Sequence, residues 1–223
     1  MERYILDQWK IIEEGFDPAY NKASESIFSL GNGRMGQRAN FEEDFSGPSF
    51  QGNYIAGVYY PDKTRVGWWK NGYPEYFAKV INSANWIGIK VVVNGENLDL
   101  AKCKALDFHR ELNMREGYLQ RKFKAVLANG NRIEVEALRF LSMTRDELGL
   151  IRYTVKALNF DGAVQIIPYI DGDVKNEDSN YDEKFWTPVF SEISERSALI
   201  SMETKKTRFE VCTGMSCKFF RNG

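Results

Sequence analysis

The chain has 223 residues, of which 43% are hydrophobic and 14% aromatic, and its 30 basic residues almost balance its 31 acidic residues. This composition supports a packed core and argues against disorder, and no basic stripe marks a nucleic-acid partner. The apolar runs are far too short for a membrane span, and the first ten residues do not resemble a signal peptide. We therefore expect a globular protein without nucleic-acid or membrane partners.

Cysteine and histidine are scarce, which limits the available chemistry. Cys103, Cys212 and Cys217 are odd in number and lack C-x-x-C spacing, so we expect free thiols in a reducing, cytoplasmic compartment. His109 is the single histidine. We interpret it as a structural or surface residue, and we expect no metal site.

Along the chain, the first distinctive stretch is "SLGNGRMGQRANFEED" (29–44), which contains G-x-G-x-x-G in Gly31, Gly33 and Gly36. A dinucleotide fingerprint needs a preceding strand and a following helix. "ESIFSL" (25–30) could supply the strand, but no amphipathic helix follows Gly36. We therefore predict that the glycines shape a turn, where their backbone freedom is needed.

Further along, "PEYFAKVI" (74–81) is the best helix candidate, because Pro74 suits a first helical position. "WIGIKVVVNGENLDL" (86–100) predicts a hairpin instead. Its Asn94-Gly95 pair favours a type I′ turn, whose positive φ angles suit a tight connection between strands.

The second half of the chain reads as strands separated by turns. "GYLQRKFKAVL" (117–127) places Leu119, Phe123, Ala125 and Leu127 on one face, and "IEVEALRFLSM" (133–143) alternates in the same way after a loop longer than two residues. Further strands are expected at 148–158, at 163–170 and, two or three in number, between residues 198 and 220. Such spacing predicts an all-β fold with few short helices, an antiparallel sandwich forming one domain over residues 1–223.

Two groups of acidic residues were considered as catalytic or metal-binding sites. Inverting glycoside hydrolysis needs two carboxyl groups about 6.5–9.5 Å apart, a distance that sequence cannot supply for Glu42, Glu43 and Asp44 or for Asp171 and Asp173. The 171–182 stretch also fits an EF-hand loop poorly. We interpret these acids as solvated loop residues or turn caps, and predict no catalytic residue and no metal ligand.

Loops rich in aromatic and polar residues are the remaining candidates, because loops carry function disproportionately and sugar rings stack on aromatic faces. We predict that two loops face a ligand or a partner domain. Their candidate residues are Asn32, Arg38 and Glu42 in the first loop, and Trp68, Trp69 and Tyr73 in the second.

Several stretches in fixed order resemble the N-terminal region of glycoside hydrolase family 65, which includes maltose, trehalose and kojibiose phosphorylases. They are "ESIFSLGNGRMGQRANFEED", "GNYIAGVYY", "INSANWIGIKVVVNGENLDL", "RELNMREGYLQRKF", "EALRFLSMTRDELGLIRYTV" and "IDGDVKNED". The resemblance implies a galactose-mutarotase-like β-sandwich preceding an (α/α)6 barrel that carries the catalytic acid. It also implies an α-linked glucose disaccharide as substrate, with inorganic phosphate as co-substrate if the enzyme is a phosphorylase, and no other cofactor.

Two functions follow from these observations. The first is a non-catalytic N-terminal domain of an inverting α-glucoside phosphorylase or hydrolase, which supports and caps the absent barrel and contributes to a homodimer. The second is a stand-alone carbohydrate-binding module that uses exposed aromatic residues. The first predicts a large apolar surface on the isolated chain, where the barrel would otherwise pack.

Overall fold

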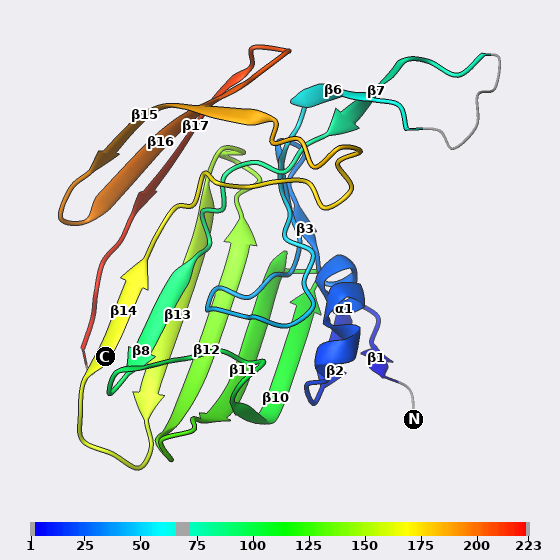
Figure 1. The fold of residues 1–223 in the computed structure, drawn as a ribbon. Helices are drawn as coiled ribbons and strands as arrows, with labels where there is room; N and C mark the ends of the chain where they lie inside the picture. The colour runs from blue at the N-terminus through cyan, green and yellow to red at the C-terminus, as the bar shows by residue number, and fades with distance from the viewer. Residues whose placement is uncertain (1–2, 66–71, 222–223) are drawn as a thin grey trace. The chain divides into compact units, whose positions relative to one another are not determined.

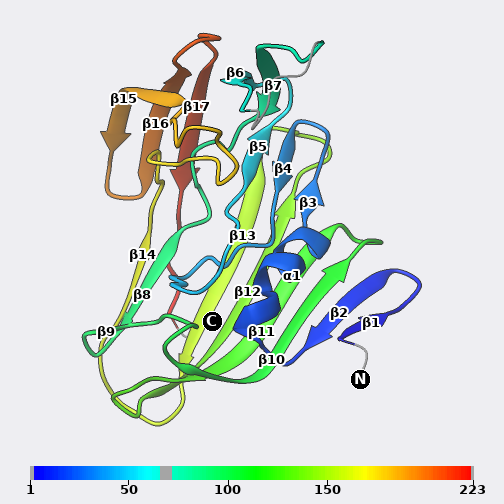
Figure 2. The same ribbon diagram turned by 45° about the vertical axis from the view of Figure 1, so that its right-hand side comes forward.

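A computed structural model describes residues 3–65 and 72–221 of the chain. The described residues form antiparallel strands with one short α-helix and one 3-10 helix (Figures 1 and 2). Contacts divide the chain into two compact units: unit 1 is Met1–Gln51 with Ile87–Pro168, and unit 2 is Gly52–Trp86 with Tyr169–Gly223. Each unit thus takes two separate stretches of the chain. The expectation of one domain over residues 1–223 stays a prediction.

Unit 1 is built on a six-stranded antiparallel sheet (Figure 1). In sheet order its strands are β1 (Tyr4–Leu6), β2 (Lys10–Glu14), β10 (Lys104–Asn113), β11 (Tyr118–Val126), β12 (Arg132–Leu141) and β13 (Gly149–Ala157). The predicted alternation is confirmed in β11, where Leu119, Phe123 and Ala125 are buried and Lys122 on the opposite face is exposed. β12 follows the same pattern, and residues 127–131 form the expected longer loop between the two strands.

A second, three-stranded sheet of unit 1 has the order β14, β8, β9, with bounds Val164–Pro168, Ile89–Val93 and Glu96–Asn97. The turn between β8 and β9 holds Asn94 at a φ of 49° and Gly95 at a φ of 85°. Positive φ at both central residues is the requirement of a type I′ turn, so the predicted hairpin is confirmed. Asn94 Oδ1 also accepts a hydrogen bond from the Ala163 N–H at 3.0 Å.

Apolar side chains of the two sheets meet in one core, which makes unit 1 the predicted antiparallel sandwich. Val91 and Val93 of β8 pack in the same cluster as Phe123 of β11 and Val135 of β12. Aromatic rings complete the cluster, with the centroids of Phe16, which lies just after β2, and Phe108 of β10 5.2 Å apart. Burial of large apolar side chains between sheets is the main force that holds such a fold together.

The helices lie at residues 18–27, as the 3-10 helix η1 (Pro18–Tyr20) and the α-helix α1 (Asn21–Ile27). The suggestion of a strand over 25–30 is therefore wrong for its first half. Asp17 Oδ1 accepts a hydrogen bond from the Ala19 N–H at 3.0 Å and Pro18 follows it, which is the usual way to start a helix. No helix among the described residues has both the length and the hydrophobicity of a membrane span.

Unit 2 contains a three-stranded antiparallel sheet and a two-stranded ribbon. The sheet is β15 (Trp186–Ile193), β16 (Ser197–Thr204) and β17 (Glu210–Ser216), the ribbon is β6 (Tyr59–Lys63) with β7 (Tyr76–Val80), and β5 covers Asn53–Ile55. β16 and β17 confirm the strands expected between residues 198 and 220. β15 has no counterpart among the predicted strands.

The helix predicted over residues 74–81 is wrong, because residues 76–80 form β7. β7 pairs with β6 in continuous register from Tyr76 opposite Lys63 to Val80 opposite Tyr59. Aromatic and β-branched residues fit a pleated strand, and a neighbouring strand that supplies the hydrogen bonds overrides a local helical signal. Pro74 precedes the strand, where its missing N–H removes no bond from the ladder.

The core of unit 2 forms where the ribbon and the sheet supply apolar side chains. Tyr60 of β6 stacks on Phe185 with ring centroids 4.2 Å apart, and Met202 of β16 belongs to the same cluster. Trp186 is buried beside them, and its indole N–H donates to the Asn82 carbonyl at 2.7 Å. A buried indole keeps its hydrogen bond in this way, so its burial carries little polar cost.

Candidate functional site

The glycine motif forms a β-hairpin in unit 1. β3 (Leu30–Gly31) pairs with β4 (Met35–Gln37), and Gly31 lies directly opposite Gly36. Gly33 has a φ of 90°, a conformation that favours glycine, in the turn between the two strands. Because Gly36 belongs to a strand and opens no helix, the segment lacks the geometry of a dinucleotide site. The predicted turn is confirmed.

Asn32 ties this hairpin to another loop of unit 1. Its Oδ1 accepts hydrogen bonds from the Arg34 and Met35 N–H groups at 3.1 and 2.8 Å, which closes the turn. Its Nδ2 donates to the carbonyl oxygens of Ser142 and Asp146, each at 2.8 Å. Every polar atom of the Asn32 side chain therefore serves to hold the loop, and its contact with a ligand or partner domain stays a prediction.

Arg38 also points toward its own unit. Its Nε donates to the Phe50 carbonyl at 2.7 Å and its Nη2 to the Lys22 carbonyl at 3.1 Å. The guanidinium carbon lies 5.3 Å from the centre of the Phe50 ring, within the range of a cation–π contact. Arg38 thus fixes the path of residues 38–50, and its role toward a partner stays a prediction.

Glu42 and Glu43 are buried inside unit 1, where Arg121 holds both carboxylates. Arg121 Nη1 lies 2.5 Å from Glu43 Oε1, and its Nη2 lies 2.7 Å from Glu42 Oε2. Arg139 Nη1 lies 3.2 Å from Glu42 Oε1, and the Tyr153 hydroxyl donates to Glu43 Oε2 at 3.0 Å. We name these five residues the ionic cluster. The interpretation of Glu42 and Glu43 as solvated loop acids is wrong, because two arginines of the sheet compensate their burial.

The two arginines of the ionic cluster keep the Glu42 carboxylate ionised. Burial alone would raise the pKa of Glu42, but Arg139 and Arg121 outweigh burial and hold this pKa below its ordinary value. Burial and then the Glu43 carboxylate raise the pKa of the Tyr153 hydroxyl well above its ordinary value. A catalytic acid needs a pKa raised toward neutrality. Glu42 is shifted in the opposite direction and is only 4% exposed, so it presents no proton to a substrate.

A third arginine, Arg110, is buried near helix α1. Its Nη2 donates to Asn21 Oδ1 at 3.1 Å, and its Nε lies 3.4 Å from Glu13 Oε2. Burial lowers the pKa of Arg110 to about 10, although Glu13 opposes this shift. Its guanidinium carbon also lies 5.0–5.5 Å from the ring centres of Phe28, Phe41 and Phe108. The aromatic faces stabilise a cation that has few hydrogen-bond acceptors around it.

The three arginines come from adjacent strands and occupy the core face of the sheet. Arg110 of β10 lies opposite Arg121 of β11, and Arg139 follows on β12. Sequence analysis missed them. The signal was present, since Arg121 lies between the inward residues Leu119 and Phe123 in the two-residue period of the strand.

The other candidate acids and the histidine take ordinary structural roles. Asp171 Oδ1 accepts a hydrogen bond from the Asp173 N–H at 2.8 Å, and both residues are exposed, as expected of a turn. His109 Nδ1 lies 2.7 Å from Glu14 Oε1 on a solvent-accessible part of the sheet, in agreement with a surface histidine. Within residues 3–65 and 72–221, no group of three or more His, Cys, Asp or Glu residues could hold a metal ion.

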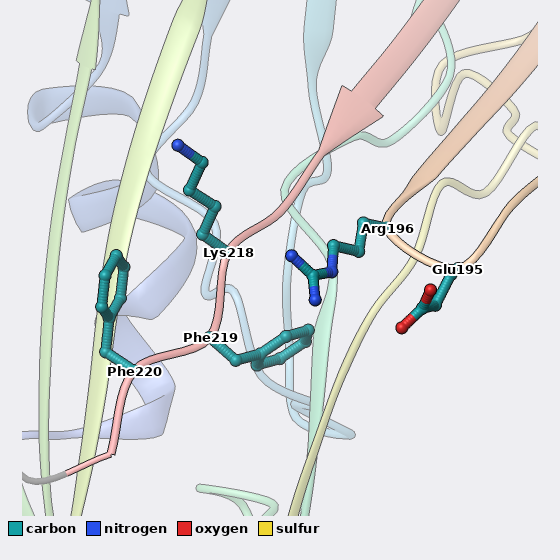
Figure 3. Close-up of a pocket in the computed structure, with 5 residues that line it drawn as sticks. All are labelled: Glu195, Arg196, Lys218, Phe219 and Phe220. Carbon is teal, nitrogen blue, oxygen red and sulfur yellow. The ribbon is translucent and has the colours of Figure 1, made fainter.

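Unit 2 has a hollow of about 390 Å³ at the end of its sheet, lined by Glu195, Arg196, Lys218, Phe219 and Phe220. Figure 3 shows Arg196 and Phe219 on one side of the C-terminal segment, with Lys218 and Phe220 extending from the other side. A ligand site needs polar groups that converge on one point within an apolar cavity. These side chains diverge, so the hollow lacks the features of a substrate site.

The aromatic loop of unit 2 is only partly described. Tyr73 is 45% exposed, whereas Trp68 and Trp69 lie outside the described residues. The role of this loop toward a ligand or a partner domain stays a prediction.

Almost the whole chain matches a known family of protein domains. The family model "Glycosyl hydrolase family 65, N-terminal domain" matches residues 11–223. The chain belongs to this family. The match extends over both units, and it confirms the resemblance drawn from the short sequence stretches.

Several curated relatives of this family 65 domain are disaccharide phosphorylases. The maltose phosphorylase of Bacillus subtilis (strain 168) is 50% identical over 183 residues, covering 82% of this chain and 24% of that protein. The α,α-trehalose phosphorylase of Thermoanaerobacter brockii is 37% identical over 186 residues, which cover 80% of this chain and 24% of that protein. The kojibiose phosphorylase of the same organism is 33% identical over 170 residues, which cover 76% of this chain and 20% of that protein. The chain therefore spans about a quarter of the length of these relatives or less.

A solved structure supports the same assignment. A protein from the human microbiome, assigned as a kojibiose phosphorylase, matches 99% of this family 65 domain with a TM-score of 0.86 and 27% identity. The match covers 29% of that longer chain. The all-β antiparallel fold predicted from the sequence is thus confirmed in a solved structure.

Proposed function

We propose that this domain is the non-catalytic N-terminal part of a disaccharide phosphorylase and that it supports and caps a separate catalytic barrel. The observation that carries the proposal is the extent of the match. The N-terminal domain model covers residues 11–223, while the matched regions are only 24% of the maltose phosphorylase and 20% of the kojibiose phosphorylase. Most of each relative therefore lies outside the region that corresponds to this chain.

The ionic cluster supports a structural role for this domain. Glu42 and Glu43 are adjacent carboxylates, but two arginines neutralise them in a buried setting. General acid catalysis needs a carboxylic acid that is protonated near neutral pH and reaches the substrate. The cluster meets neither requirement, so its carboxylates serve to fix the loop.

For the whole enzyme we propose phosphorolysis of an α-linked glucose disaccharide, with inorganic phosphate as co-substrate. Phosphate would bond to the anomeric carbon as the glycosidic bond breaks, which gives glucose 1-phosphate and a free sugar. A glutamic acid of the barrel would donate the proton to the leaving oxygen. The 50% identity to a maltose phosphorylase makes maltose the first substrate to test.

The decisive experiment compares the full-length gene product with the 223-residue chain. Each is incubated with maltose, trehalose, kojibiose or nigerose, with and without phosphate, and glucose 1-phosphate is measured. We expect product from the full-length protein alone, only with phosphate, and most rapidly from maltose. Turnover by the 223-residue chain would overturn the proposal, as would hydrolysis without phosphate by the full-length protein.

A further inference from the structure

The ribbon β6–β7 of unit 2 presents two faces of different character. In its register, Tyr59 lies opposite Val80, Pro61 opposite Ala78, and Lys63 opposite Tyr76. Because side chains alternate along a strand, these six residues share one side of the ribbon. We call this side the outer face, and its members are Tyr59, Pro61, Lys63, Tyr76, Ala78 and Val80.

The opposite, inner face anchors the ribbon in unit 2. Tyr60 is fully buried and stacks on Phe185. Asp62 is also buried, and its Oδ2 lies 2.7 Å from Lys79 Nζ. An isolated two-stranded ribbon is marginally stable in water, so these contacts hold it in place. The ribbon is therefore fixed from one side, and its outer face is a firm surface.

The outer face remains largely uncovered. Tyr59 is 44% exposed, Tyr76 45% and Val80 60%. The turn after β16 contacts two of its six members: the Phe209 ring lies 5.3 Å from the Tyr59 ring, the Thr207 hydroxyl donates to the Tyr59 carbonyl at 2.9 Å, and Lys206 Nζ lies 5.6 Å from the centre of the Tyr76 ring. Adjacent exposed apolar side chains on a firm surface are the usual mark of an interaction site.

The chemistry of the outer face fits a protein partner. It combines aliphatic side chains with two tyrosines and only one charged residue, Lys63. Interface cores are enriched in tyrosine and depleted of charge. A sugar would need convergent polar groups and a nucleic acid a cluster of cations, and the residues of this face supply neither.

We propose that the outer face is where unit 2 docks onto the catalytic part of its own enzyme chain, an inference that rests on the proposed function. The relatives carry at least three times as much chain outside the matched region as within it, since that region is 24% of their length or less. A partner tethered in the same polypeptide has a high effective concentration, so a surface of this modest size suffices for stable docking.

The test measures accessibility in the full-length enzyme. Ala78→Cys places a thiol in the middle of the outer face at an exposed position, and Thr154→Cys places one on exposed β13 as the matched control. Labelling by a maleimide is followed peptide by peptide with mass spectrometry, which separates the introduced thiols from the native cysteines. We expect the thiol at position 78 to react at least about tenfold more slowly than the control, equivalent to about 1.4 kcal/mol of protection.

A second variant tests whether apolar contact at the outer face causes the protection. Val80→Lys added to Ala78→Cys puts a charge into the interface, and labelling should then approach the control rate. Equal labelling of positions 78 and 154 in an enzyme that forms glucose 1-phosphate would overturn the docking inference and leave the proposed function standing. Protection that disappears on dilution would also overturn it, in favour of a second copy of the chain. Protection that persists in a protein without phosphorylase activity would support the docking and overturn the proposed function.

Discussion

At the residue scale, the most informative feature of this domain is the row of arginines in the core of unit 1. Moving a charge out of water costs several kcal/mol, which a buried ion pair recovers only with excellent geometry and further hydrogen bonds. Arg121 meets this condition through Glu42 and Glu43, and Arg139 donates twice to the Asn40 carbonyl at 3.2 Å. The pairs therefore specify one path for residues 38–44 across the sheet.

Replacement of Arg121 tests this interpretation. Arg121→Met keeps most of the side-chain volume but leaves Glu43 buried without its counter-ion and Glu42 paired with Arg139 alone. We expect the free energy of unfolding to fall by about 3–5 kcal/mol, the usual cost of breaking a buried pair. Urea denaturation followed by circular dichroism measures the change.

The control for this experiment is Arg152→Met. Arg152 lies 3.8 Å from Glu136 in a pair that is largely exposed, so its loss should change the free energy by no more than about 0.5 kcal/mol. Similar small losses in the free energy of unfolding for Arg121→Met and Arg152→Met would show that the ionic cluster stabilises the domain no more than an exposed ion pair does. Arg121→Met combined with Glu43→Gln should recover part of the stability, because Glu42 keeps Arg139 as its partner and no buried carboxylate then lacks a counter-ion.

The sequence supports part of this residue-level picture. The turn role of Gly33 follows from its backbone freedom, and the interpretation of His109 as a structural or surface residue follows from its being the single histidine of the chain. The burial of Glu42 does not follow, because it depends on Arg121 and Arg139, which are far away in the sequence and meet it only after the sheet has formed. Acids in a polar loop look solvated until their partners are known.

At the element scale, period-two alternation predicted β11 and β12 correctly, since each buries one face, but the equally long β10 and the strand β15 were not predicted. Two short segments adopt a structure opposite to the one that their local sequence predicts: residues 76–80 form a strand instead of a helix, and residues 25–27 form a helix instead of a strand. β7 became a strand because β6 supplies its ladder, whereas residues 25–27 became helical because Asp17 and Pro18 start a helix upstream. Strand pairing and helix capping both depend on residues outside the segment, so the sequence of the segment alone does not reveal them.

The β8–β9 hairpin allows a precise test at this scale. Asn94→Ala forces a residue with a β-carbon to hold a positive φ and removes the acceptor of the Ala163 N–H. We expect a loss of about 1.5–3 kcal/mol in the free energy of unfolding. Asn94→Gly keeps the backbone freedom and loses only the hydrogen bond, so its cost should stay below about 1 kcal/mol. Equal losses for the two variants would contradict the role assigned to the backbone conformation.

At the scale of the whole molecule, large apolar side chains remain in contact with solvent. In unit 2, Ile193 is 84% exposed and Phe220 is 83% exposed, and Phe190 lies on the same sheet as Ile193. Apolar side chains left in contact with solvent favour association with another protein surface. The large continuous apolar surface expected of an isolated N-terminal domain stays a prediction.

These exposed side chains predict that the 223-residue chain associates in solution. Size-exclusion chromatography with light scattering should show a mass that rises with concentration. Ile193→Lys with Phe220→Lys should shift the chain toward monomer, because charges oppose apolar association. Met143→Lys, at an exposed position of unit 1, is the control and should leave the association unchanged. A wild-type chain that stays monomeric at every concentration would contradict the prediction.

The division of each unit between two stretches of chain bears on how the protein is made. β2 ends at Glu14, and β10, its partner on the side away from β1, begins only at Lys104. At about 5–20 residues per second, the ribosome leaves β2 without its partner for roughly 5–20 s. Segment 52–86 emerges during that interval and must wait in turn for residues after 168. The nascent chain therefore carries two unfinished units at once, the condition under which a ribosome-associated chaperone protects a protein from aggregation.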